Sequence, residues 1–355
     1  MQDLSISDEN EIWVSTLGGV FLISDGTIDK KLTTIDGLYR LDAQAIIYDD
    51  ANDRVIIGYN DGGIDVLNPD TGEIEFLGDI LRADNFSPRG INEFIIRNNN
   101  LYIATDFGIV NYDLNTLLVR DSYTKLGILN RGLPVNDISI EGDSIYAATS
   151  EGIAYASLND ELEFSDRWLN YNTENGFISE PVLTIEAIDD QIYASTNSQN
   201  WLLENGTWQV SNIFGPLIQG YQKYGQLLLA FSRNRVFVLE DNGTLNSVSL
   251  GDEVATSAEV MDGNSFFIGS LNAGVGSLSP NLSEITYFMP EGPYQNSITD
   301  LNFSDDVLIA SSSNESDRNS DIDRGKGYYI FQDGEWLNFN AQNNETIRNA
   351  DYRQA

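Results

Sequence analysis

The sequence predicts an all-β protein built from repeated sheets of four short strands, and three observations support this prediction. An apolar triplet followed by a small residue recurs about every 42 residues along the chain. Turn signals rich in Asn, Asp and Gly separate the apolar runs at intervals of about 8 to 12 residues. No helical apolar periodicity persists for three turns. A repeat of about this length, made of short strands and turns, is typical of a β-propeller.

The repeat is aligned on the middle apolar residue of each triplet, which we call the reference residue. The eight reference residues are Trp13, Ile56, Tyr102, Tyr146, Tyr193, Leu228, Phe267 and Leu308. Two positions after each of them stands a small residue, in chain order Ser15, Gly58, Ala104, Ala148, Ser195, Ala230, Gly269 and Ala310. We expect bulk to be excluded at these small residues, because the sheets of a propeller converge there.

Within one unit, each element follows from the residues in order. The apolar triplet suits a strand buried on both faces, because its apolar residues run continuously. A Gly then turns the chain into the next strand, such as residues 20–23. A second turn leads to an outer strand, such as 73–76, and a loop such as 131–134 leads to the innermost strand of the next unit. Four short strands per unit form one blade.

The number of units predicts the domain organisation. Seven four-stranded units over residues 1–297 are enough to close one ring, so we expect a seven-bladed β-propeller there. Residues 298–355 then form an additional, partial blade at the C-terminus. It is either an eighth blade of the same ring or the first blade of a second one. The polar tail 341–355 contains no apolar strand to finish a unit, and we favour the opening of a second propeller.

The composition argues against several classes of function. The net charge of −36 and the isoelectric point near 4.1 disfavour nucleic acid and anionic lipid as partners. The sequence has no Cys and no His, so thiolate chemistry, Ser-His-Asp triads and the commonest transition-metal ligand are excluded. No apolar stretch approaches the length of a membrane-spanning helix. We therefore expect no nucleic-acid partner or membrane-spanning segment, and no residue stands out as catalytic, cofactor-binding or metal-binding.

Carboxylates are abundant enough to form glycosidase-like pairs, for example Glu186 with Asp189 and Asp190, or Asp300 with Asp305 and Asp306. These residues fall at strand ends and hairpin turns, where Asp is favoured by the turn geometry. We therefore interpret them as structural.

Two other features are candidate binding residues. Trp201 replaces the Gly-apolar turn of its unit and is expected to face the top of a blade or the central channel. The long polar insertion 314–325 carries Asp317, Asp321 and Asp323, whose oxygens suit Ca²⁺, but their spacing does not match an EF-hand loop. A disordered loop, or a loop that contacts a partner, is the favoured interpretation.

Several segments resemble known repeat families. The pattern of 131–138, 145–149 and 152–153 resembles the propeller repeats of extracytoplasmic sensors in hybrid two-component regulators. Segments 57–67 and 288–297 more narrowly resemble the N-terminal β-propeller of the PorZ family, a component of the type IX secretion system of Bacteroidetes.

The PorZ resemblance implies two propellers followed by a C-terminal β-sandwich, of which this chain is the first propeller and the opening blade of the second. It also implies a non-catalytic accessory at the cell surface or in the periplasm. Such a protein assists the sortase of the secretion system, contacts other secretion proteins and binds anionic lipopolysaccharide. In this acidic chain the lipopolysaccharide needs a local basic site, for example near Arg233 and Arg235. Residues 1–4 do not form a signal peptide, and we expect an upstream segment to be trimmed.

Two alternatives remain open from the sequence. One is the ligand-sensing propeller of a two-component regulator, which requires a membrane helix and a kinase domain downstream. The other is a propeller enzyme that acts on polysaccharide, which requires a catalytic carboxylate on one face of the ring.

Overall fold

The computed structural model describes residues 1–177, 180–279, 282–293, 298–312, 327–333, 335–340 and 343–347. These residues form eight antiparallel sheets of four strands each, together with short 3-10 helices. The chain divides into two compact units, unit 1 (Met1–Met289) and unit 2 (Pro290–Ala355). The all-β class and the four-stranded blades predicted from the sequence are confirmed.

Unit 1 contains seven of the sheets, and in each of them four consecutive strands pair in chain order. The strands of the first four sheets are β1 (Asp3–Ile6), β2 (Ile12–Thr16), β3 (Gly19–Ser24), β4 (Thr27–Leu32), β5 (Ala43–Asp49), β6 (Arg54–Tyr59), β7 (Ile64–Leu67), β8 (Ile74–Leu77), β9 (Ile91–Arg97), β10 (Asn100–Thr105), β11 (Gly108–Asp113), β12 (Leu118–Tyr123), β13 (Val135–Glu141), β14 (Ser144–Thr149), β15 (Gly152–Ser157) and β16 (Leu169–Asn170). The strands of the next three are β17 (Val182–Ile188), β18 (Gln191–Thr196), β19 (Asn200–Glu204), β20 (Thr207–Ser211), β21 (Gly220–Tyr224), β22 (Leu227–Ser232), β23 (Arg235–Leu239), β24 (Leu245–Ser249), β25 (Ala255–Val260), β26 (Phe266–Ser270), β27 (Gly274–Leu278) and β28 (Ile285–Phe288). The 3-10 helices η1 (Ser165–Arg167) and η2 (Thr173–Asn175) lie in the connections on either side of β16.

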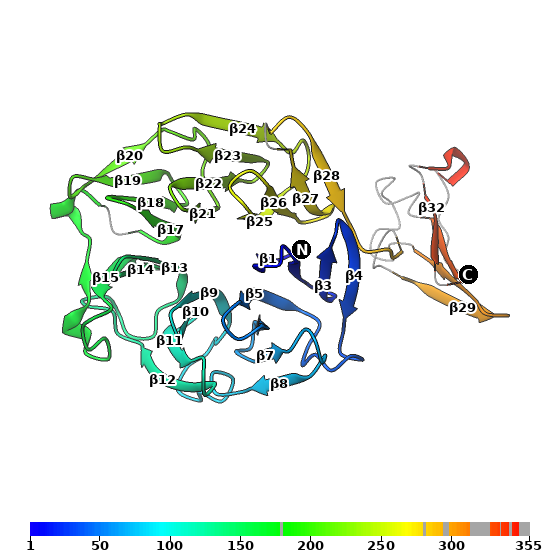
Figure 1. The fold of residues 1–355 in the computed structure, drawn as a ribbon, viewed down its shortest axis with the longest axis horizontal. Helices are drawn as coiled ribbons and strands as arrows, with labels where there is room; N and C mark the ends of the chain where they lie inside the picture. The colour runs from blue at the N-terminus through cyan, green and yellow to red at the C-terminus, as the bar shows by residue number, and fades with distance from the viewer. Residues whose placement is uncertain are drawn as a thin grey trace, which may run out of the picture. The chain divides into compact units, whose positions relative to one another are not determined.

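The seven sheets form a closed ring around a central axis (Figure 1). The first strand of each sheet is innermost, and each contacts the innermost strands of both neighbouring sheets, including β25 against β1. No strand is exchanged between the first and the last sheet, because the first contains only β1 to β4. Side-chain packing therefore closes the ring: Leu4, Val14 and Phe21 form one buried cluster with Phe267 and Val275. We call this junction the seam.

The small residues of the repeat lie where neighbouring sheets pack closely, as the sequence predicts. A Cβ atom on Gly58 would lie only 2.7 Å from Ile91 Cγ2 of the next innermost strand. A Gly opens the third strands β3, β11, β15 and β27, and it has a second role. Gly108 has a φ of +138° and would place a Cβ 2.3 Å from the carbonyl oxygen of Tyr123, so a side chain is excluded there by both conformation and space. Gly58 and Gly108 thus occupy positions where neighbouring atoms leave no room for a side chain.

The described residues of unit 2 form one sheet, made of β29 (Asp300–Ser304), β30 (Val307–Ser311), β31 (Tyr328–Gln332) and β32 (Glu335–Phe339), and the 3-10 helix η4 (Glu345–Ile347). Tyr328 stacks on Phe339 with their ring centroids 4.9 Å apart, which joins β31 to β32. On β29, Leu301 and Phe303 are exposed by 59% and 69%. The candidate residues Asp317, Asp321 and Asp323 lie outside the described residues.

Candidate functional site

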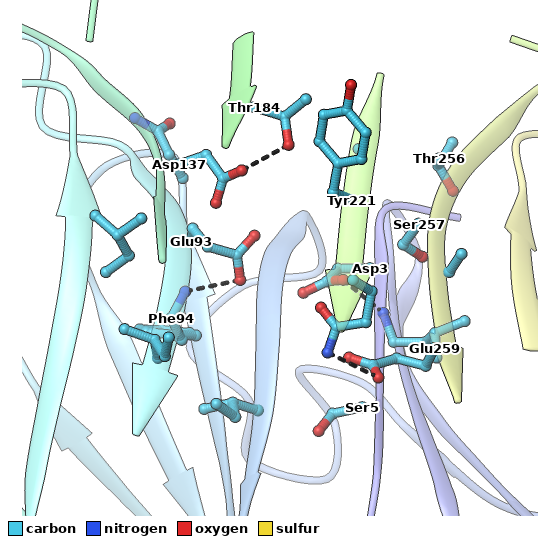
Figure 2. Close-up of a pocket in the computed structure, with 18 of the residues that line it drawn as sticks. Asp3, Ser5, Glu93, Phe94, Asp137, Thr184, Tyr221, Thr256, Ser257 and Glu259 are labelled. Atoms are coloured by element: carbon cyan, nitrogen blue, oxygen red, sulfur yellow. Dashed lines mark hydrogen bonds between the residues drawn. The ribbon is translucent and has the colours of Figure 1, made fainter. Parts of the chain in front are cut away.

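The centre of the ring holds a polar cavity of about 510 Å³ (Figure 2). Residues from the innermost strands of all seven sheets line it. Five of the lining residues are carboxylic acids: Asp3, Glu93, Asp137, Glu186 and Glu259. Only one lining residue, Lys223, is a cation. The cavity is therefore rich in carboxyl groups and poor in cations.

The strand register places one set of innermost-strand residues at two levels, and all of them except Ala45 and Ser139 line the cavity. The upper level faces the small residues of the second strands and consists of Asp3, Ala45, Glu93, Asp137, Thr184, Tyr221 and Ser257. The lower level faces the reference residues and consists of Ser5, Ile47, Ile95, Ser139, Glu186, Lys223 and Glu259. Because side chains two residues apart point to the same side of a strand, each sheet contributes one residue to each level.

The first sheet is tied to the second by Asp3 and Ser5. The backbone N–H of Ile46 donates to Asp3 Oδ2 at 2.9 Å, and that of Tyr48 donates to Ser5 Oγ at 3.0 Å. These two amides belong to β5 and point out of its sheet edge toward the cavity. Asp3 and Ser5 thus satisfy donors that the neighbouring sheet cannot pair itself.

The fourth sheet is tied to the fifth in the same way. Asp137 Oδ2 accepts from the backbone N–H of Ile185 at 2.8 Å and from Thr184 Oγ1 at 2.7 Å. Ser139 Oγ accepts from the backbone N–H of Ala187 at 3.0 Å. An Asp-x-Ser sequence at the start of an innermost strand is therefore a repeated inter-sheet tie, which we call the Asp-x-Ser tie.

Lys223 joins three sheets at the lower level. Its Nζ donates to the backbone oxygens of Ile140 at 2.6 Å and Ala187 at 2.8 Å. The same ammonium lies 2.7 Å from Glu141 Oε2 and 3.5 Å from Glu186 Oε1. Its charge and its hydrogen-bonding capacity are both engaged within the protein.

Burial shifts the acidity of the cavity carboxyls. Desolvation raises the pKa of Asp3 to about 7 and that of Asp137 to about 6, against the opposing effect of the hydrogen bonds that they accept. Desolvation raises the pKa of Glu186 to about 7, although the nearby Lys223 ammonium lowers it. Desolvation and the charge of Asp3 raise the pKa of Glu259 to about 8. The same two effects, together with the charge of Asp137, raise the pKa of Glu93 well above its usual value.

The cavity carboxylates Asp3 and Asp137 hold neighbouring sheets together, and the described acidic residues around them are not grouped as in a catalytic or metal site. Glu186 lines the cavity, whereas Asp189 and Asp190 are exposed in the β17–β18 turn, so these three do not form a carboxylate pair. In the part of the chain that the structure describes, no group of three or more acidic side chains is placed to hold a metal ion. None of its helices is long and apolar enough to span a membrane.

The structure separates the binding residues predicted from the sequence. Trp201 lies in β19 and is only 4% exposed; its ring packs on Phe177, and its Nε1 donates to Glu180 Oε1 at 3.4 Å. Arg233 and Arg235 are exposed at the β22–β23 turn, where one Arg235 nitrogen donates to Ser247 Oγ at 3.2 Å. A binding role for these three residues stays a prediction.

Sequence reasoning missed the inter-sheet ties. The signal that could have found them is the shared pattern of Gln2-Asp3-Leu4-Ser5-Ile6 and Asn136-Asp137-Ile138-Ser139-Ile140, which begins two innermost strands. The position of Lys223 has no such signal, because its partners come from two other sheets.

The fold and the cavity define the class of protein: a β-propeller whose ring of seven blades is followed by one further four-stranded sheet. Residues 12–169 match the family model of the N-terminal β-propeller domain of PorZ, of the type IX secretion system. The resemblance to PorZ predicted from the sequence is therefore confirmed over these residues.

Solved structures agree on the fold. The chain is similar to PorZ of Porphyromonas gingivalis, described as an essential bacterial surface component of the type-IX secretion system, with a TM-score of 0.75 and 16% identity. The match covers 96% of this chain and 45% of that one, so this chain spans less than half the length of PorZ. It is also similar to the computationally designed protein Ika8, with a TM-score of 0.54, 12% identity and coverage of 88% and 92%. No protein with a curated description matches the sequence.

Proposed function

We propose that this protein is a non-catalytic accessory component of a type IX secretion system, resembling PorZ. The match of residues 12–169 to the PorZ propeller family is the observation that carries the proposal. The similarity of fold over nearly the whole chain supports it. The absence of His and Cys from the sequence and the structural engagement of Asp3, Asp137 and Lys223 favour a scaffold over an enzyme.

We further propose that the protein works outside the cytoplasm, at the outer-membrane surface or in the periplasm. There it assists the sortase that processes secreted cargo, contacts other secretion proteins and binds anionic lipopolysaccharide. The exposed guanidinium groups of Arg233 and Arg235 support the last of these roles, because most of the surface is acidic. Arginine pairs well with phosphate and carboxylate groups.

We propose that residues 298–355 begin a second propeller, after a first ring over 1–297. The exposed apolar side chains of β29 support this, since the other innermost strands are covered by their neighbours. A further sheet beside β29 would remove Leu301 and Phe303 from water, and burial of each side chain would contribute roughly 1.5–3 kcal/mol.

The test is co-purification from the bacterium that encodes the protein. The full-length protein, tagged and expressed at its native level, is expected to retain the type IX sortase, and deletion of its gene is expected to leave cargo unprocessed. Normal cargo processing in the deletion strain would overturn the proposal. A membrane helix and kinase domain downstream would favour a sensor instead.

A further inference from the structure

The two faces of the ring differ in charge. Because the strands of each sheet alternate in direction, the loops from second to third strand and from sheet to sheet share one face, which we call the crossover face. Its loops contain eleven acidic residues and six cations, whereas the loops of the opposite face contain nineteen acidic residues and one cation, Arg167. The six cations are Arg40, Arg82, Arg89, Lys125, Arg131 and Arg233. An anionic group can therefore approach the crossover face more easily.

The crossover face also exposes apolar side chains. Ile35 is 95% exposed, Ile128 78% and Leu17 62%, and all three lie in loops of this face. Apolar side chains interspersed with Arg are typical of the centre of a protein–protein interface.

A cavity of about 580 Å³ opens among three loops of this face, which we call the loop cavity. The loops are 78–90, 106–107 and 124–134, which belong to the second, third and fourth sheets. The lining residues are Asn85, Phe86, Ser87, Pro88, Asp106, Phe107, Arg131, Gly132 and Pro134. The lining therefore combines apolar side chains with one cation, Arg131, and one carboxylate, Asp106, whose oxygens accept hydrogen bonds from Gly90 N and Asn92 Nδ2.

The loop cavity is held open by hydrogen bonds within the protein. Loop 78–90 is fixed to loop 106–107 because Gly90 N donates to Asp106 Oδ2 at 2.7 Å and Asp106 N donates to the Gly90 oxygen at 3.1 Å. Loop 124–134 is fixed to the neighbouring β14–β15 turn because Asn130 N donates to Glu151 Oε2 at 3.1 Å. A cavity that exists before binding needs little ordering of the protein when a ligand enters.

Arg131 supplies the charge of the loop cavity. Its Nε donates to Thr124 Oγ1 at 3.3 Å, which orients the exposed guanidinium. Within the described residues Arg131 makes no ion pair, whereas Arg40 and Arg82 of the same face each pair with an Asp. In a protein of net charge −36, a guanidinium at a cavity without a carboxylate partner is suited to an incoming carboxylate.

The walls favour a peptide over a sugar. Phe86 is stacked on Phe107, with ring centroids 4.5 Å apart and planes 11° apart, and its edge lies against Gly132. This packing covers one face of each ring, and Phe107 is buried while Phe86 is half-buried, so little aromatic surface is left for a sugar ring to stack on. Pro88 and Pro134 offer apolar contacts of the kind that apolar peptide side chains use.

We propose that the loop cavity binds an extended acidic segment of a partner protein, with a side-chain or C-terminal carboxylate on Arg131 and an adjacent apolar side chain against Pro88 and Pro134. This inference goes beyond the secretion role. It is tested on the purified protein without any secretion component, so its failure and the failure of the proposed function are distinguishable.

The experiment begins with selection from a displayed library of random short peptides on the purified full chain. Enriched peptides are expected to share an Asp, Glu or free C-terminal carboxylate beside an apolar residue. Their affinity, measured by fluorescence anisotropy, is expected to fall at least about tenfold in Arg131→Glu. Arg131→Lys should lose less, since it keeps the charge but not the bidentate geometry.

Two further variants control the result. Ser87→Trp fills the loop cavity without changing its charge and is expected to abolish binding, while Arg167→Glu repeats the charge change on the opposite face and should bind like the parent. Thermal unfolding checks that each variant is folded. Failure to enrich acidic peptides, or affinities unchanged in Arg131→Glu and Ser87→Trp, would overturn the proposal. So would Arg131-dependent binding of oligogalacturonate, an acidic sugar probe, without peptide binding.

Discussion

The first strands of two sheets, β1 and β29, begin with the same two residues but have different surroundings. Leu4 of β1 is 2% exposed, whereas Leu301 of β29 is 59% exposed. β1 is flanked by β5 and β25, so its apolar side chains are covered from both neighbouring sheets. The difference shows that the neighbouring sheets bury the apolar side chains of the first strand. The sheet to which the strand belongs does not bury them alone. Stability in such an array is a sum of sheet and interface contributions.

The largest expected effect comes from removing the same side chain in the two strands. Leu4→Ala should lower the free energy of unfolding by about 2–4 kcal/mol, because it leaves a cavity in the buried cluster at the seam. Leu301→Ala should change it by less than about 0.5 kcal/mol, because that side chain is already in water. Urea denaturation of both variants measures the contrast. Equal losses would show that β29 is packed as tightly as β1.

The second largest expected loss of stability comes from breaking an Asp-x-Ser tie. Asp137→Ala leaves the backbone N–H of Ile185 without its acceptor, and we expect a loss of about 1–2 kcal/mol. Asp160→Ala, at an exposed position on the opposite face, is the control and should be neutral. If the two variants unfold at the same denaturant concentration, the tie does not contribute to the junction between the fourth and fifth sheets.

The sequence predicts the repeated sheets because the small residues and glycines of the repeat occur where strands pack too closely for a larger side chain. Gly58 and Gly108 stand where a Cβ would collide with a neighbouring strand, so the periodic small residues and glycines indicate both the sheet and its spacing. The interior of the cavity is less predictable. An Asp at the start of an innermost strand resembles any turn-forming Asp until its partner amide in the next sheet is known.

The environments of individual candidate residues depend on contacts that are distant in sequence. Trp201 departs from the local pattern, and its packing on Phe177 comes from a loop that has no signal of its own. Phe86 and Arg131 meet only because three sheets place their loops on one face. Residue type and spacing therefore predict the repeated four-stranded sheets better than they predict which side chains come together in a cavity.

The pH dependence of stability tests the cavity carboxyls at the seam. The folded-state pKa of Glu259 is raised to about 8 from 4.5, so its contribution is fully present below about pH 4.5 and is lost as the pH rises towards 8. The parent protein should therefore have a lower Tm at pH 8 than at pH 5. Glu259→Gln, which can still pair with Gln222, should reduce this drop by a few degrees, equivalent to ~1 kcal/mol. The exposed Glu284→Gln is the control, and an identical drop in all three proteins would contradict the assignment.

The smallest expected effect on the free energy of unfolding comes from a substitution on β29. Phe303 is 69% exposed, so Phe303→Lys should leave the free energy of unfolding within about 0.5 kcal/mol of the parent. The same change removes an exposed aromatic side chain from a strand that already exposes Leu301, and it should reduce self-association at high protein concentration. Sedimentation velocity over a range of concentrations measures this, with the exposed Leu245→Lys on β24 as the matched control. Because both strands lose one exposed apolar residue, only a change specific to Phe303→Lys would show that β29 presents an adhesive surface. If both variants or neither alter association, the exposure of β29 has no more consequence than that of any outer strand.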